Sequence, residues 1–158
     1  MASSVAHAAP ETEPYEFTID NGVRFVVVPD FRAPVVVHMV WYQAGSVDEQ
    51  QGKTGIAHML EHMMFKGSEK FPQDVYSDIL KNSGVDNRAY TTNDYTNYHL
   101  NFSKQHLDKV LEIEADIFQN LSYTEEQFRT EALTVKGEYL KNNASPIRKL
   151  LSAVRQEA

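Results

Sequence analysis

The chain has 158 residues, of which 42% are hydrophobic and 23% are charged, and its formal net charge is −7. This length and composition suit one globular domain with its own core. The acidic balance argues against a nucleic-acid surface, which needs a basic patch, and no apolar run reaches the ~18 residues of a membrane-spanning helix. Cysteine is absent, so any metal must be held by His and carboxylate side chains.

The first residues are small and carry no pattern of a fold. Ala6-His7-Ala8 before Ala9-Pro10 resembles the cleavage end of a secretory signal, but the charged start and the apolar run of a signal are missing. We expect residues 1–14 to form a flexible tail and residues 15–158 to form one domain. The tail favours a periplasmic or secreted protein, and the cytoplasm or the mitochondrial matrix is the alternative.

The first predicted elements are a hairpin and a long strand. Residues 15–19 and 24–28 are rich in strand-forming residues, and between them lies Asp20-Asn21-Gly22, a strong hairpin turn. Residues 35–42 form a continuous run of β-branched, apolar and aromatic side chains. Such a run predicts a central strand that is covered on both faces.

The rest of the chain alternates helical signals with a second pair of strands. Thr54 can cap a helix that Gly67 ends, and Thr124 with Gln127 forms a capping box that opens another helix. The predicted elements are helices 54–66 and 72–83, strands 85–92 and 95–102, and helices 107–118, 124–140 and 146–158. This order predicts an α+β fold with helices packed on one face of a mainly antiparallel sheet. The last helix reaches the end of the sequence, so we expect the natural domain to continue past Ala158 and this part of it to be truncated there.

The candidate chemistry lies in His58-Met59-Leu60-Glu61-His62, within the first predicted helix. Residues four apart lie about 40° apart and one turn along a helix, so two imidazoles can converge on one tetrahedral metal. Glu61 lies about 60° from His58 and can reach a metal-bound water without being a ligand. The other residues of the helix are apolar, which predicts a buried helix in which a metal satisfies the polar groups. The alternative is two core histidines with ordinary hydrogen bonds and a surface Glu.

A catalytic zinc needs a third protein ligand and keeps one position for water. The candidates in this sequence are His99, His106, Glu112, Glu114, Glu131 and Glu138. Glu131 and Glu138 are seven residues apart on one predicted helix, so they share a face. On that observation alone, a solvated acidic face explains them better than a metal site does, and the third ligand stays open.

Residues 55–67, Gly-Ile-Ala-His-Met-Leu-Glu-His-Met-Met-Phe-Lys-Gly, resemble the inverted zinc motif of the pitrilysin/insulinase (M16) metallopeptidases. In that family a third ligand, a Glu, follows the second His by about 75 residues, and a supporting Glu lies seven residues before it. These positions fall on Glu138 and Glu131. The strand motifs of the family are matched by Gly84, Ala89, Thr91, Thr96 and Tyr98. The resemblance runs from residue 15 to about residue 141 and implies the fold of one M16 peptidase half-domain, a metallohydrolase-like sandwich.

The resemblance also implies a mechanism, the hydrolysis of extended peptides or unfolded proteins. Zinc held by His58, His62 and Glu138 would activate a water, Glu61 would take its proton and pass it to the leaving amine, and Glu131 would support catalysis. The strand around residues 87–91 could pair with an extended substrate as an added strand. The expected substrate-binding residues are Asn87, Arg88, Ala89, Tyr90 and Thr91.

One position departs from the family pattern. The family usually has Asn directly before the Ala of this strand, where the present chain has Arg88, and Asn87 lies one residue earlier. A shift of one residue turns a side chain to the other face of a sheet unless a bulge corrects it. The role of polarising the substrate carbonyl is therefore open for both residues.

The resemblance implies a partner as well. Relatives enclose their substrate between two homologous halves, in one chain or in a dimer, and only one half is found in this sequence. We therefore expect a second half or a partner subunit, in a homodimer or a heterodimer, and no nucleic-acid partner. The alternative function is a zinc-binding half that is inactive without that partner.

Overall fold

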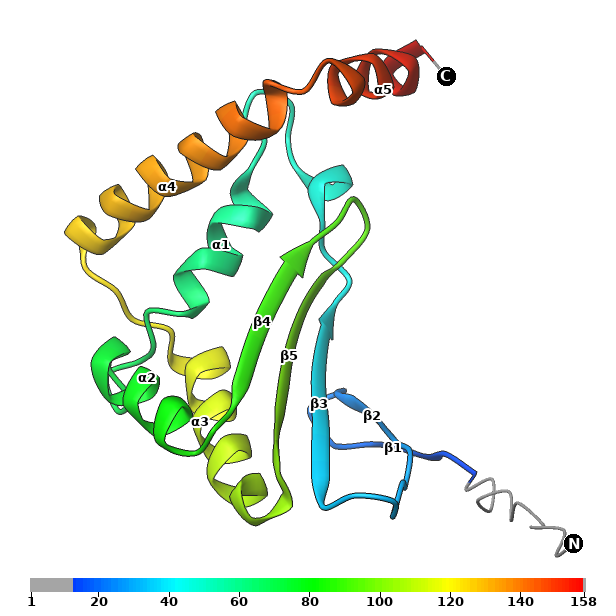
Figure 1. The fold of residues 1–158 in the computed structure, drawn as a ribbon, viewed down its shortest axis with the longest axis vertical. Coiled ribbons are helices and arrows are strands. Elements are labelled where there is room, and N and C mark those ends of the chain that lie inside the picture. Colours follow the sequence, from blue (N-terminus) through cyan, green and yellow to red (C-terminus); the bar gives the residue numbers. More distant parts are fainter. Residues whose placement is uncertain (1–12, 158) are drawn as a thin grey trace, which may run out of the picture. The chain divides into compact units, whose positions relative to one another are not determined.

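The computed structural model describes residues 13–157, so the interpretation of residues 1–12 lies outside the described residues. The chain divides into two compact units, residues 1–34 and residues 35–158. In chain order (Figure 1) the elements are β1 (Tyr15–Thr18), β2 (Arg24–Val27), β3 (Val35–Tyr42), the 3₁₀ turn η1 (Ser46–Asp48), α1 (Ile56–Met64), α2 (Gln73–Asn82), β4 (Asp86–Thr91), β5 (Thr96–Ser103), the 3₁₀ turn η2 (Lys104–His106), α3 (Leu107–Asn120), α4 (Glu125–Asn143) and α5 (Pro146–Glu157).

The first unit contains the predicted hairpin. β1 and β2 pair in antiparallel register, with Phe17 opposite Phe25, and the two rings stack with their centroids 5.0 Å apart. Gly22 has a φ of 89° in the connecting turn, a conformation that glycine adopts without strain. The turn signal in the sequence was therefore sufficient to locate this hairpin, and the prediction is confirmed.

The second unit is built on a three-stranded antiparallel sheet in the order β3-β5-β4. The predicted central position of residues 35–42 is wrong, because β3 lies at an edge and β5 lies in the middle. Side chains of β3 alternate between exposed and half-buried, and Trp41 is 53% exposed. The apolar run misled the prediction because both faces of β3 carry apolar side chains, while elements of residues 35–157 cover only one face.

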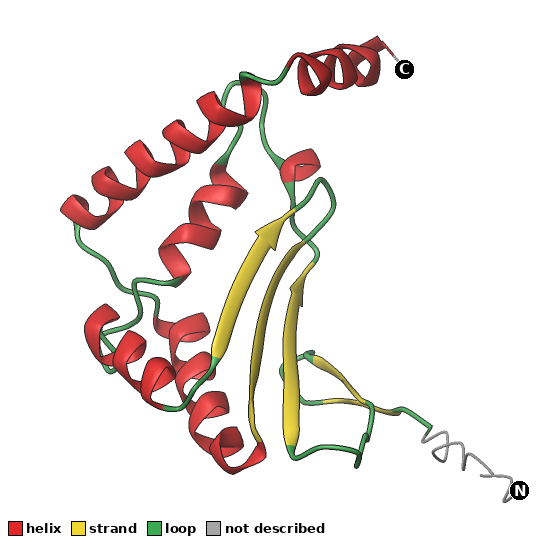
Figure 2. Cartoon of the chain, viewed as in Figure 1, coloured by secondary structure: helices red, strands yellow, loops and turns green. Residues whose placement is uncertain are grey.

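Helices α1, α2 and α3 pack on one face of this sheet, as Figure 2 shows. Strand β5 supplies Tyr98, Leu100 and Phe102 to the core. The helices complete it with Met64 of α1, Tyr76 and Leu80 of α2, and Val110, Ile113 and Ile117 of α3. The predicted α+β fold, with helices on one face of an antiparallel sheet, is confirmed. Among residues 13–157, none of the helices has the length and apolarity to cross a lipid bilayer.

Helix α1 is shorter and less buried than its sequence predicts. It begins at Ile56 after an N-cap at Gly55, so the predicted cap at Thr54 is wrong. Gly55 has a φ of 97°, and its lack of a side chain leaves the first turn without a local cap. Met63 and Met64 are buried, but Ile56 is 56% exposed, so only one side of the helix faces the core.

Helix α4 begins as predicted and packs against α1 (Figure 1). The Thr124 hydroxyl accepts a hydrogen bond from the Gln127 N–H, and the Gln127 side chain accepts one from the Thr124 N–H at 2.8 Å. This capping box satisfies two N–H groups that the helix cannot satisfy itself. It fixes the start of the element that carries Glu131 and Glu138.

Candidate metal centre

Two neighbouring helices bring three potential metal ligands together. His58 and His62 lie one turn apart on α1, and their Nε2 atoms are 3.2 Å apart. Glu138 of α4 places Oε2 at 3.4 Å from Nε2 of His58 and 3.6 Å from Nε2 of His62. Each of the three residues offers one ligand atom to the cluster, and all three are partly buried. The predicted trio is therefore assembled in space.

The spacing of these atoms suits a zinc ion. Bond lengths of about 2.0–2.2 Å in a tetrahedral site separate neighbouring ligand atoms by about 3.4 Å, and the three separations here lie within 0.2 Å of that value. The donors are two imidazole nitrogens and one carboxylate oxygen, a set that zinc accepts. The side chain of Glu138 is 45% exposed, so the cluster is open to water on one side. Zinc enzymes need such an open position for water or substrate.

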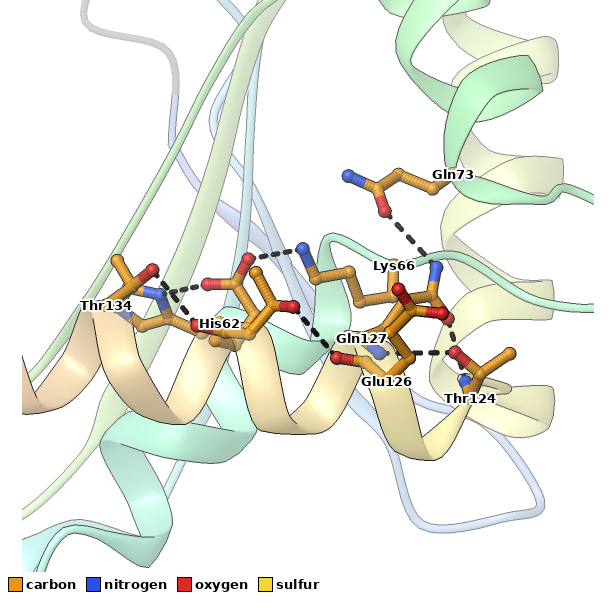
Figure 3. Close-up of polar contacts among 9 residues, drawn as sticks. His62, Lys66, Gln73, Thr124, Glu126, Gln127 and Thr134 are labelled. Carbon is orange, nitrogen blue, oxygen red and sulfur yellow. Dashed lines mark hydrogen bonds and ion pairs between the residues drawn. The ribbon is translucent and has the colours of Figure 1, made fainter.

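Glu131 lies on α4, as Glu138 does, and contacts α1, but it is not one of the three clustered residues. Its Oε2 lies 3.1 Å from Nδ1 of His62, the nitrogen on the far side of the ring from the cluster. Its other oxygen accepts a hydrogen bond from Lys66, and Figure 3 shows His62 and Lys66 meeting α4 along this line of contacts. A proton on Nδ1 of His62 donates to Glu131 and leaves Nε2 with a free lone pair. Glu131 is thus placed to orient His62.

Lys66 keeps Glu131 ionised. The hydrogen bond from Lys66 lowers the pKa of Glu131, burial raises the pKa by less, and the contact with His62 lowers it further. The side chains of Lys66 and Glu131 are only 10% and 16% exposed. Each charge stabilises the other in this buried position, because leaving either one unpaired would cost free energy.

Glu61, on the same helix as the two histidines, contacts strand β4. It is 7% exposed, and its Oε2 accepts a hydrogen bond of 2.5 Å from the Thr91 hydroxyl of β4. Thr91 in turn lies 3.4 Å from the hydroxyl of Thr96, which donates to the carbonyl of Ala44. A chain of hydroxyl contacts therefore holds one oxygen of the buried Glu61 carboxylate. Burial of Tyr98 raises the pKa of its hydroxyl, and the nearby charge of Glu61 raises it further.

The remaining candidates for a third ligand lie in other surroundings. Glu114 of α3 pairs with His38 of β3 at 2.6 Å. Glu112 pairs with Lys70 at 2.8 Å on the surface, and Nε2 of His106 lies 3.1 Å from the side-chain amide of Gln105. His99 pairs with Arg88 across strands β5 and β4, on the face away from the helices. Among the described residues, the three-residue cluster contains Glu138 and none of these others.

The five expected substrate-binding residues alternate between the faces of β4. Asn87, Ala89 and Thr91 face the helices and are half-buried, whereas Arg88 and Tyr90 are exposed on the other face. The register against β5 is continuous, so no bulge re-aims Asn87. The Asn87 amide donates to the Tyr76 hydroxyl at 2.6 Å, and the Arg88 guanidinium pairs with Asp86. Both polar side chains therefore already have partners within the protein.

Sequence reasoning missed three contacts around this centre. Lys66 follows His62 by four residues, a helical spacing that indicates neighbouring side chains, although it falls just beyond the end of α1. Thr91 was expected to touch substrate, but its hydroxyl contacts Glu61. Glu49 accepts hydrogen bonds from the start of α1, and no signal in the sequence pointed to it.

Comparison with known proteins identifies the family. A family model described as "Insulinase (Peptidase family M16)" matches residues 24–158. The chain belongs to the M16 family. The predicted membership of this family is thereby confirmed.

Relatives in the M16 family are named both as peptidases and as subunits of larger complexes. The "Zinc protease PqqE" of Helicobacter pylori is 37% identical over 122 residues, which are 77% of this chain and 28% of that protein. A probable mitochondrial-processing peptidase subunit beta of Arabidopsis thaliana is 32% identical over 78% of this chain and 23% of its own length. Subunit 1 of the rat cytochrome b-c1 complex is 32% identical over 87% of this chain and 28% of its own length.

Solved structures show the same fold. A protease from Helicobacter pylori superposes with a TM-score of 0.81 at 34% identity, over 88% of this chain and 34% of that one. The first half of the periplasmic protease PqqL from Escherichia coli gives a TM-score of 0.82 at 24% identity and covers 94% of this chain. The present chain spans about a third or less of these M16 proteins.

Proposed function

We propose that this chain carries the catalytic centre of a zinc-dependent endopeptidase that hydrolyses extended peptides or unfolded proteins. The observation that carries the proposal is the trio of His58, His62 and Glu138, whose ligand atoms lie 3.2–3.6 Å apart. Membership of the M16 family supports it, and so does the relative that is named a zinc protease. Family membership alone does not establish peptidase activity, because another relative is named as a cytochrome b-c1 subunit.

Each residue of the proposed centre has a separate task. When zinc is bound, it supplies a Lewis acid that polarises a carbonyl and lowers the pKa of a bound water toward about 7. His58, His62 and Glu138 hold the ion, and Glu131 fixes the tautomer of His62 through Nδ1. Lys66 keeps Glu131 anionic, so that Glu131 accepts a hydrogen bond and does not donate one. His58, His62 and Glu138 would therefore offer a preorganised set of ligand atoms to the metal.

Glu61 serves as the general base in this proposal. The Thr91 hydroxyl holds Oε2 of Glu61, which leaves Oε1 to accept a proton from a water. The same carboxyl group then donates the proton to the leaving amine, so that Glu61 ends the cycle ionised. Thr91 restricts the rotation of the carboxylate and keeps Oε1 directed consistently from one cycle to the next.

The free edge of β4 suits an extended substrate. The N–H of Thr92 donates to the carbonyl of Tyr95 at 2.8 Å, which closes the β4–β5 turn. Bonded and non-bonded pairs alternate from there along an antiparallel ladder, so the main-chain groups of Thr91, Ala89 and Asn87 point away from β5. Among the described residues no further strand pairs with this edge. A peptide could add there as another strand, with affinity from main-chain hydrogen bonds and loose sequence preference.

A second candidate function is a zinc-binding half that needs a partner for useful activity. It is favoured by the short span of this chain relative to its M16 relatives and by the relatives that are named as subunits. The partner would be a second homologous half, in the same chain or in a dimer. We propose a periplasmic or secreted location, with the cytoplasm or the mitochondrial matrix as the alternative, since the names of relatives include both a periplasmic protease and mitochondrial proteins.

Metal content and hydrolysis together test the proposal. The full-length protein should retain about one zinc per chain after dialysis, and the double variant His58→Ala, His62→Ala should retain none. Glu61→Gln should keep the zinc but lose nearly all hydrolysis of an unfolded peptide, because an amide does not take up the proton. Similar cleavage rates for native protein and Glu61→Gln would contradict the role of Glu61, and stoichiometric zinc in the double variant would contradict the ligand set.

A further inference from the structure

The helix that carries the candidate centre is capped from outside by Glu49. Helix α1 has Gly55 as its N-cap, and Gly55 has no side chain with which to bond the first N–H groups. Oε2 of Glu49 accepts a hydrogen bond from the Gly55 N–H at 2.7 Å, and Oε1 accepts one from the Ala57 N–H at 2.8 Å. One carboxylate thus satisfies two donors and places a negative charge at the positive end of the helix.

The loop that presents Glu49 is fixed to the β4–β5 turn. The N–H of Ser46 donates to the Thr92 carbonyl at 3.1 Å, and the N–H of Val47 donates to the Asn93 carbonyl at 3.0 Å. Gly45 lies so close to the turn that a Cβ atom would stand 2.3 Å from the Asn93 carbonyl oxygen. The 3₁₀ turn η1 therefore packs directly on the hairpin that contains β4, and Glu49 follows η1 immediately.

We propose that Glu49 is a positioning residue that fixes α1, with His58, Glu61 and His62, relative to the β4–β5 hairpin. This inference rests on the proposed function, in which the hairpin receives the substrate and α1 supplies the ligands and the base. Glu49 accepts a hydrogen bond from the N–H of Ala57, so the contact lies one residue before His58, the first proposed ligand.

The length of α1 explains why such an external contact matters. Helix α1 has only nine residues, and isolated helices of fewer than about 12 residues are marginal in water. Loss of the cap should let the first turn open and move His58 relative to His62 and Glu138. A displacement of about 1 Å can lower a rate by about 100-fold, because the reacting atoms no longer have the distance and alignment that the reaction needs.

Variants of Glu49 in the full-length protein, as its gene encodes it, test the inference. Glu49→Ala removes both acceptors, and Glu49→Gln keeps the size but offers only one carbonyl oxygen to the two donors. Glu69→Gln, an exposed carboxylate in the loop after α1, is the matched control. Four quantities are measured: the zinc dissociation constant by chelator competition, kcat and KM at saturating zinc, and the rate of hydrogen exchange of residues 55–60 in the metal-free protein.

We expect Glu49→Ala to weaken zinc binding by about 10-fold, the lower part of the range for contacts that support ligands. Exchange at the start of α1 should become faster by at least about 5-fold, as expected when a cap worth about 1 kcal/mol is lost. At saturating zinc, kcat should fall while KM stays within about 2-fold, since the groups that pair with substrate are unchanged. Glu49→Gln should lie between native protein and Glu49→Ala, and Glu69→Gln should match native protein.

Native exchange and native zinc affinity in both Glu49 variants would overturn the inference. Faster exchange with unchanged zinc affinity and kcat would also overturn it, because Glu49 would then stabilise the helix without positioning the centre. Should Glu49→Ala fail to fold, Glu49→Gln alone still gives these outcomes. If native protein binds zinc but hydrolyses nothing, the proposed function fails, while exchange and zinc affinity still decide the role of Glu49.

Discussion

At the scale of the residue, the two acidic side chains of α4 near α1 differ in what they contact. Glu138 faces the Nε2 atoms of His58 and His62, whereas Glu131 contacts Nδ1 of His62 and the Lys66 ammonium. We therefore expect Glu138→Gln to lose zinc during dialysis against a mild chelator. Glu131→Gln should retain it longer, with an affinity lowered by about 10–100-fold and partial activity. Competition with a chromogenic chelator measures the zinc affinity of both variants. If Glu131→Gln loses zinc before Glu138→Gln does, then Glu131 is the ligand and Glu138 the supporting residue.

Lys66 allows a second prediction about single residues. Lys66→Met leaves the Glu131 carboxylate buried without its cation, so the free energy of unfolding should fall by about 3 kcal/mol. Zinc affinity should also fall by about 10-fold, because Glu131 no longer holds His62 firmly. Lys70→Met is the control: it removes an exposed pair with Glu112 and should change stability by less than about 1 kcal/mol. Urea unfolding of the metal-free proteins measures stability, and equal losses in the two variants would contradict this account.

At the scale of the element, the alternation along β4 makes a prediction about the substrate. Its outward main-chain groups recur at every second residue, at Asn87, Ala89 and Thr91, so a paired peptide would use every second amide of its own. A cleavable peptide should therefore lose affinity when alternate amides are N-methylated. We expect KM to rise by about 5-fold for each lost hydrogen bond, worth about 1 kcal/mol. Methylation of the intervening amides is the control, and a profile without this period of two would exclude strand addition at β4.

At the scale of the whole molecule, large apolar side chains are exposed at many described positions, and residues 35–157 contain two regions of them. One is the face of β3 away from the helices, where Met39 and Trp41 are 48% and 53% exposed. The other lies on α4 and α5, where the most exposed apolar side chains are Leu133 at 72% and Ile147 at 70%. Exposed apolar patches of this kind usually pack against further protein.

This surface predicts how residues 1–158 behave when they are produced alone. We expect them to self-associate or to bind a hydrophobic dye, and to hydrolyse peptide at least about 10-fold more slowly per bound zinc than a protein in which they are joined to a second homologous half. Light scattering after gel filtration and rates normalised to zinc content measure these two properties. If adding a homologous partner chain restores the rate, the inactive-half hypothesis is supported. Equal rates with and without a second homologous half would show that this half is dispensable.

The sequence by itself determined the elements and the chemistry that depend on local spacing. The four-residue separation of His58 and His62 places both imidazoles on one side of a helix, whatever surrounds it. The hairpin turn at Asn21-Gly22 and the capping box at Thr124 are equally local and were located from a few residues. The assignment of Glu131 and Glu138 had a different origin, because it came from resemblance to the M16 family and not from the helix pattern.

Only the tertiary structure decided how distant elements meet. The position of β3 at an edge, the hydrogen bond from Thr91 to Glu61 and the cap that Glu49 gives to α1 all join separate parts of the chain. Hydrophobic periodicity reports which side of an element is apolar, but it does not identify the neighbour that covers that side. A hydrogen bond between distant residues depends on the packing of whole elements, so residue spacing in the sequence gives no measure of it.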